Sequence, residues 1–281
     1  MVLEHLISNK RLERTPALTL ALAFIFVSTA VLLTYYFYNI GSSMFVIELV
    51  VMPAIPFFLR FIMHEEKEHE VEACHRHSML RIYKPIIELY GMFFIGVALS
   101  FAFWAAALPQ DVSAKMFADQ RAELGLLTGA GSSQFTYNKF AEFSMVFSHN
   151  LGVLALMLIF AFLYSIGAVF LLVWNASLLG IFLEGFVREL IPLFSNFGVL
   201  AFPAAFSLGT VKGLLMVLPH GVFEIPAFFV ASIAGGILSV ALEHRMYRKR
   251  GFVEMIEDVG KLVILAVALL AVAAFIESIY I

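Results

Sequence analysis

The sequence predicts an all-helical, polytopic membrane protein, a transmembrane bundle of about six to eight helical segments. Hydrophobic residues make up 62% of the 281 residues, and the mean hydropathy is +0.93. Charged residues make up 14%, well below the level of about 25% in soluble domains. The net charge is −3 and the basic residues form no patch, so the composition gives no indication of nucleic-acid binding. The partner that it predicts is the lipid bilayer.

Three spans are predicted in the first part of the chain. The first, Ala17 to Tyr38, follows a basic cluster as in a signal peptide, but its apolar run of about 20 residues is long enough to cross a bilayer. We therefore interpret it as a retained helix. Met44 to Ile62 forms the second span, in which Pro53 and Pro56 predict a kink or a break. Ile86 to Leu108 forms the third.

Residues 63–84, between the second and third spans, are strongly charged, and four histidines alternate there with glutamates. A solvated helix with charged pairs one turn apart explains this composition. The alternative is a metal site that includes Cys74, although the spacing matches no zinc signature. Cys74 is the single cysteine, so an intramolecular disulfide is impossible. The four histidines are His64, His69, His75 and His77.

The second half of the chain begins with residues 110–139, a mixed segment that we interpret as an external loop, partly helical. Phe140 to Trp174 is apolar except at Ser148 to Asn150, which predicts a surface helix leading into a fourth span from about Leu151. Three further apolar pieces precede the final span, Lys261 to Ile281. These pieces are Leu178 to Leu190, Ile191 to Leu218 and Val222 to Leu242.

The basic clusters predict the orientation. By the positive-inside rule, the N-terminus, the charged loop 63–84 and the cluster at 245–250 are cytoplasmic, and residues 110–139 are outside. The fourth span then ends inside near Asn175, so an even number of crossings must separate it from Arg245. Since three apolar pieces lie between them, at least one segment is broken or re-entrant. Irregular backbone at membrane depth is tolerated only within the protein or along a wet cavity.

The most informative motif lies in this interrupted region. Residues 218–227 read Leu-Pro-His-Gly-Val-Phe-Glu-Ile-Pro-Ala, with His220 and Glu224 inside apolar sequence. Ionisable groups at bilayer depth are costly unless they find partners or water. If Pro219 occupies the first turn of a helix, His220 and Glu224 lie on one face of it, because they are four residues apart.

Three short motifs resemble those of the stage II sporulation protein M family of bacterial and archaeal membrane proteins. The decapeptide at 218–227 is similar to the family's Leu-Pro-His-Gly-x-x-Glu signature, and residues 149–151 supply its asparagine-leucine pair. Residues 175–180 are similar to its Asn-Gly-x-x-Leu-Gly, with Ala176 in place of the glycine. The resemblance implies a membrane scaffold, since in spore-forming bacteria the family acts with peptidoglycan-degrading hydrolases during engulfment.

We interpret residues 1–281 as a single integral membrane domain. A polar centre is expected at its core, with Glu184 and Arg188 as secondary candidates. The residues expected in the centre are His149, Asn150, Asn175, Lys212, His220 and Glu224. The parts of the domain are N-terminal helices at 1–109 with the charged cytoplasmic loop 63–84, the external loop 110–139, a family-like core at 140–244, and a basic loop and final helix at 245–281.

The favoured function is a non-enzymatic scaffold or membrane-remodelling component in the cell membrane, in which the polar side chains link helices. The first alternative is an ion- or proton-coupled transporter or channel that uses His220 and Glu224. The second is an intramembrane hydrolase with His149, His220 and Glu224 around a metal. No catalytic residue and no cofactor is assigned. Protein partners or a second copy of the chain are left open.

Overall fold

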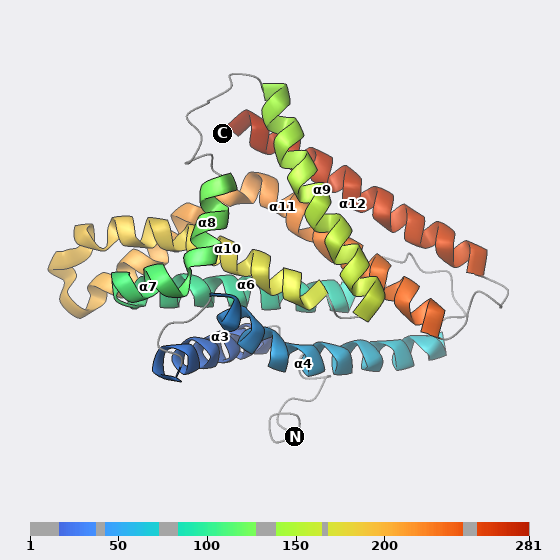
Figure 1. Ribbon diagram of the computed structural model, residues 1–281, viewed down its shortest axis with the longest axis horizontal. Coiled ribbons are helices and arrows are strands. Elements are labelled where there is room, and N and C mark those ends of the chain that lie inside the picture. Colours follow the sequence, from blue (N-terminus) through green and yellow to red (C-terminus); the bar gives the residue numbers. More distant parts are fainter. Residues whose placement is uncertain are drawn as a thin grey trace. The chain divides into compact units, whose positions relative to one another are not determined.

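The computed structural model describes residues 17–37, 43–72, 84–127, 139–164, 168–243 and 252–280 (Figure 1). This part of the chain is almost entirely helical and contains no strand. Six of its helical segments are long and apolar enough to cross a membrane, which confirms the predicted all-helical membrane fold. In chain order the elements are α3 (Ala17–Phe37), α4 (Ser43–Glu72), α6 (Lys84–Ala107), α7 (Gln110–Met116), α8 (Ala118–Leu127), α9 (Lys139–Tyr164), α10 (Ala168–Leu190), the 3-10 helix η1 (Pro192–Leu200), α11 (Ala201–Glu243) and α12 (Phe252–Tyr280).

The helices form two compact units. The first unit takes its helices from Met1–Glu65, Glu88–Ser133 and Leu172–Met216. Small residues bring its helices together: a Cβ on Gly96 of α6 would lie 2.7 Å from the Ala23 Cβ of α3. A Cβ on Gly180 of α10 would lie 2.6 Å from the carbonyl oxygen of Ala98 on α6. Membrane helices pack through such close backbone approaches, because lipid provides no hydrophobic drive between them.

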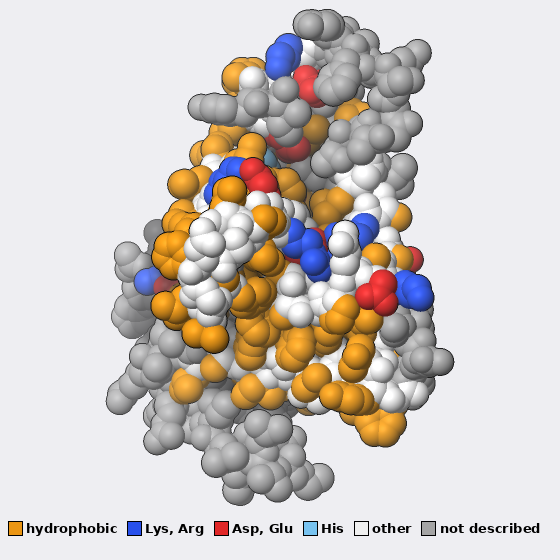
Figure 2. Space-filling model, turned by 90° about the vertical axis from the view of Figure 1, so that its left-hand side faces the viewer, with side chains coloured by type: hydrophobic (Ala, Val, Ile, Leu, Met, Phe, Trp, Pro, Cys, Tyr) orange, Lys and Arg blue, Asp and Glu red, His pale blue; other side chains and the backbone are white. Residues whose placement is uncertain are grey.

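A helical hairpin belongs to the first unit and contains the predicted interruption. The chain turns in η1, where Gly198 has φ 56°, a conformation that favours glycine. The start of α11 then packs back on α10, since a Cβ on Gly209 would lie 2.6 Å from the Val187 Cα. The turn is apolar and exposed, with Leu193 70% and Val199 93% exposed. Figure 2 shows a face on which hydrophobic side chains predominate and a few charged ones gather.

The bounds of several helices differ from those that the sequence predicted. Of the kink or break predicted at the α4 prolines, the break is wrong, because α4 includes both Pro53 and Pro56, and the kink stays a prediction. A surface helix ending at 148–150 is also wrong, since α9 passes through these residues. The Ser148 hydroxyl donates to the Met145 carbonyl oxygen, at 3.0 Å, so this polar group is satisfied within the helix itself. The single span predicted from about Leu151 to Trp174 is also wrong, because two helices share this stretch. Helix α9 ends at Tyr164, and α10 runs from Ala168 through Trp174 to Leu190.

The second unit takes its helices from Glu66–Ile87, Gln134–Leu171 and Val217–Ile281, and consists mainly of α9, α12 and the second half of α11. Helices α9 and α12 pack along one another (Figure 1). Helix α9 also contacts α11, because a Cβ on Gly235 would lie 2.5 Å from the Leu158 carbonyl oxygen. The Ser232 hydroxyl lies 3.8 Å from the Met157 sulfur at the same contact. Helix α9 therefore touches both of the other helices.

Candidate functional site

The candidate site is a polar centre in the second unit, to which three helices contribute. Its residues are Asn150 on α9, His220 and Glu224 on α11, and Glu277 on α12. The condition that Pro219 occupies the first turn of a helix is not met, since α11 begins at Ala201 and passes through Pro219. The predicted shared face does not depend on that start. In any continuous helix, His220 and Glu224 are one turn apart and adjacent.

The ionisable groups of the polar centre are close together. One ligand atom from each of His220, Glu224 and Glu277 can be chosen so that all lie within 4.8 Å of one another. All three residues are half-buried. Glu224 and Glu277 also interact electrostatically, and two like charges at such a separation repel strongly where water is scarce. Among the described residues, neither carboxylate forms a salt bridge with Lys or Arg.

Asn150 holds one of these carboxylates. Its side chain is 7% exposed and forms a hydrogen bond with Glu224, in which the amide donates to the carboxylate. This bond connects α9 to α11. Glu142, also on α9, interacts electrostatically with Glu277 and forms a 3.9 Å ion pair with Lys139. Helices α9, α11 and α12 therefore all bring polar groups to one place.

Glu277 is the member that sequence reasoning missed. In the sequence it is a single carboxylate near the end of the last span, where contact with a neighbouring helix or the interface is enough to explain it. The only signal in the sequence is a carboxylate within the run Ala-Phe-Ile-Glu-Ser-Ile. Which residues of α11 it faces depends on how α11 and α12 pack, and periodicity carries no information on this.

His149 does not join the group. Its side chain is exposed on α9, whereas that of its neighbour Asn150 is buried. Successive residues of a helix point about 100° apart, so the exposed His149 side chain points away from the buried face on which Asn150 lies. In the described part of the chain, the residues that could hold a metal ion together are His220, Glu224 and Glu277. His149 is not among them.

Two other predicted members belong to the first unit. Asn175 lies on α10 and is half-buried. Lys212 lies on α11, where its ammonium group donates to Glu189 at 2.8 Å and sits 5.2 Å from the centre of the Phe186 ring. The grouping of Asn175 and Lys212 with His220 stays a prediction.

The secondary candidates form a separate charged network in the first unit. The Glu184 carboxylate, 2% exposed, accepts hydrogen bonds from Arg188 on its own helix and from Arg121 on α8, the latter at 2.9 Å. Arg121 also donates to the Ser113 hydroxyl at 3.1 Å. Arg188 donates to the carbonyl oxygen of Ala105 at the end of α6. The network ties α6, α7, α8 and α10 together, which indicates a structural role.

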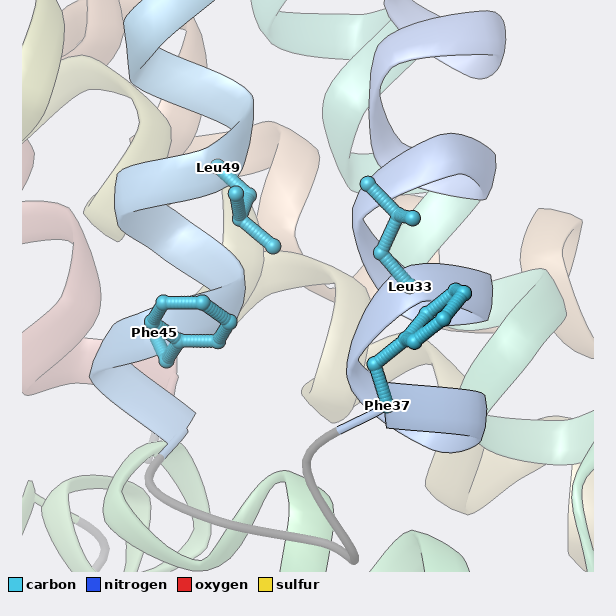
Figure 3. Close-up of a pocket in the computed structure, with 4 residues that line it drawn as sticks. All are labelled: Leu33, Phe37, Phe45 and Leu49. Atoms are coloured by element: carbon cyan, nitrogen blue, oxygen red, sulfur yellow. The ribbon is translucent and has the colours of Figure 1, made fainter.

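An open apolar depression lies between α3 and α4 in the first unit (Figure 3). It is lined by four apolar side chains: Leu33, Phe37, Phe45 and Leu49. Ligand sites usually add a few convergent polar groups that orient the ligand. This lining offers none from its side chains, so the depression is a weaker candidate than the polar centre.

Chemically, the polar centre combines one imidazole nitrogen with two carboxylates. Such groups can exchange protons, accept hydrogen bonds, or bind a divalent cation. Comparison with known proteins adds one finding. A model of the family described as "Stage II sporulation protein M" matches residues 91–280, more than half of the chain and including every member of the polar centre. Neither the curated proteins nor the solved structures yielded a match.

Proposed function

Because the chain belongs to the stage II sporulation protein M family and is a multi-pass membrane protein, we propose that it is a non-enzymatic membrane scaffold. Its polar centre fixes one arrangement of the helices in the second unit. The observation that carries the proposal is that Asn150, Glu224 and Glu277 come from three different helices and meet at one place. Interhelical polar contacts of this kind select helix partners in lipid, where apolar packing alone discriminates poorly.

A scaffold needs a defined arrangement more than a path through its interior. The close approach of Gly235 to the Leu158 backbone supports such an arrangement, because it leaves no space between α9 and α11 at that level. The Asn150 bond to Glu224 adds a polar link between the same two helices. Together they favour a fixed packing of this helix pair.

We place the N-terminus in the cytoplasm and the chain in the cell membrane. The basic residues of 10–14 and 245–250 and the charged stretch 63–84 support this orientation through the positive-inside rule. Cys74, the single cysteine, lies in that stretch and serves as a natural reporter. A membrane-impermeant maleimide should label Cys74 in inverted vesicles and leave it unlabelled in intact cells. Labelling in intact cells would reverse the orientation.

Reconstitution tests the scaffold against its main competitor. The purified chain is placed in liposomes loaded with a pH-sensitive or a divalent-cation-sensitive dye, beside Glu224→Gln and empty liposomes. A scaffold should give the same slow leak in all three. Native electrophoresis of gently extracted membranes should also place the chain in a complex larger than its 31.3 kDa monomer. A monomeric chain with rapid flux that Glu224→Gln abolishes would overturn the proposal.

An ion-coupled transporter is the second candidate, and one observation favours it. Two carboxylates and a histidine within 4.8 Å lie on segments long enough to span the membrane. Ionisable groups within membrane-spanning segments often mark ion or proton pathways. The flux measurement decides between the two functions, because only the transporter requires Glu224 for movement of an ion.

A further inference from the structure

We propose that His220, Glu224 and Glu277 bind one divalent transition-metal ion, Zn²⁺ or Mn²⁺, which bridges α11 and α12. The proposal deepens the scaffold function and rests on it in one respect: the ion would reinforce the helix packing already assigned to the polar centre. Binding itself is a separate property. It can be measured whether or not the chain proves to be a scaffold.

The geometry is close to that of a metal site. Ligands on one ion at about 2.0–2.2 Å lie at most about 4.4 Å from each other. The three ligand atoms lie within 4.8 Å of one another, so modest side-chain rotations bring them into range. His220 and Glu224 are four residues apart on α11, the spacing at which two ligands of one helix face reach the same ion. Glu277 approaches from α12 and completes a three-residue set.

The charges of the polar centre favour a cation. Glu224 and Glu277 carry two negative charges when ionised, and no described Lys or Arg forms a salt bridge with them. The nearby Glu142 is paired with Lys139, at 3.9 Å. A divalent ion would bring the sum for the two carboxylates to zero. The ion would thus remove the repulsion between the two carboxylates. Unpaired charges are especially costly within membrane-spanning helices.

The donor types narrow the choice of ion. Imidazole nitrogen suits Zn²⁺ and other transition metals, and carboxylate oxygen suits Mn²⁺ and Zn²⁺. None of the three described ligands is a thiolate, which a softer ion would favour. Three protein ligands leave a coordination position open for water. Asn150 would support the site without binding the ion itself, because it is buried and its amide hydrogen-bonds the Glu224 carboxylate. Metal-ligating carboxylates typically have such a partner.

The experiment measures metal content on the full chain in detergent. The purified protein is stripped with a chelator, incubated with Zn²⁺ or Mn²⁺, passed through a desalting column and assayed by mass spectrometry of the elements. We expect about one ion per chain, by the one-ion geometry of a three-ligand site. Replacing histidines 64, 69, 75 and 77 of the charged stretch 63–84 by alanine controls for adventitious binding there and should leave this ion in place.

Variants of the ligands test the assignment. Glu277→Gln and His220→Ala should each weaken binding by more than tenfold, and Asn150→Ala by about 10- to 100-fold. Glu257→Gln, an exposed carboxylate on the same helix as Glu277, is the matched control and should bind normally. Size-exclusion chromatography and circular dichroism confirm that each variant is folded.

The outcomes separate metal binding from the scaffold function. Retention of the ion in folded Glu277→Gln and His220→Ala, or a wild-type chain that holds no ion, would overturn the metal site and leave the scaffold standing. Loss of the ion in these variants would establish the metal site. If flux through liposomes then depended on the same residues, the scaffold would fail while the metal site survived.

Discussion

Asn150 on α9 hydrogen-bonds the Glu224 carboxylate on α11, two residues that are distant in the sequence and adjacent in the second unit. Asn150→Ala removes this link and leaves the carboxylate without its donor. We expect a loss of about 0.6–1.7 kcal/mol in the free energy of unfolding, the range measured for polar contacts between membrane helices. Equilibrium unfolding in mixed detergent micelles measures it. Ser148→Ala is the control, because Ser148 bonds only within its own helix.

If Asn150→Ala and Ser148→Ala unfold at the same denaturant concentration, the bond between α9 and α11 does not contribute to stability. Stabilisation of the helix packing would then not explain why these polar residues are present.

Gly235 brings α11 close to the backbone of α9. A Cβ there would lie 2.5 Å from the Leu158 carbonyl oxygen and 2.7 Å from the Ala161 Cβ, so Gly235→Ala must push the helices apart. We expect a destabilisation of about 1–3 kcal/mol, typical of overpacking. Gly260→Ala on α12 is the matched control, because a Cβ there has no described atom within 4 Å. It should be neutral or stabilising, since alanine favours helix more than glycine does.

The two substitutions add the same methyl group to a helix, so thermal unfolding followed by circular dichroism compares them directly. Equal melting temperatures would show that α9 and α11 are not packed at Gly235 in the folded protein.

Glu184 is the buried acceptor of the Arg121 and Arg188 hydrogen bonds in the first unit. Glu184→Gln removes its charge and leaves two guanidinium groups without a counter-charge. We expect a cost of about 1–3 kcal/mol in unfolding free energy, below the full cost of a buried pair because both arginines are about one-third exposed. Glu189→Gln on the same helix breaks the exposed pair with Lys212 and should cost less than about 1 kcal/mol.

Added salt distinguishes the two further. The exposed pair between Glu189 and Lys212 should lose its effect as salt rises, whereas the Glu184 network should be affected much less. A Glu184→Gln variant as stable as Glu189→Gln at low salt would show that the network contributes little.

Local periodicity was sufficient for part of this structure. Long apolar runs predicted the membrane helices, and the four-residue spacing of His220 and Glu224 predicted a shared face, because both depend only on the geometry of one helix. A break at Pro53 and Pro56 and an interruption at 148–150 were wrong for a physical reason. A proline removes one backbone hydrogen bond from a helix, and a serine can bond its hydroxyl to the preceding turn. Neither has to end a helix in lipid, because the remaining backbone groups have no water with which to pair.

Contacts between helices could not be predicted in the same way. Glu277 meets Glu224, and Arg121 meets Glu184, only after helices distant in the sequence have packed. Arg121 lies in a segment interpreted as an external loop, and nothing in its neighbourhood indicates a buried partner. Glu277 has no sequence motif. Both contacts depend on how the helices pack, through close approaches such as that of Gly180 to α6. A single sequence does not show which helices approach one another.

The apolar turn η1 gives the last prediction. Val199 and Leu193 are 93% and 70% exposed there, and an exposed apolar turn between two spanning-length segments is stable if lipid surrounds it. A spin label on Val199→Cys in a Cys74→Ser background should therefore be accessible to oxygen and shielded from a water-soluble nickel reagent in liposomes. A label on Lys115→Cys, an exposed position of α7, should show the reverse. If the label at 199 meets the nickel reagent as readily as the label at 115, the hairpin ends in water, and α10 and the first half of α11 are two full crossings.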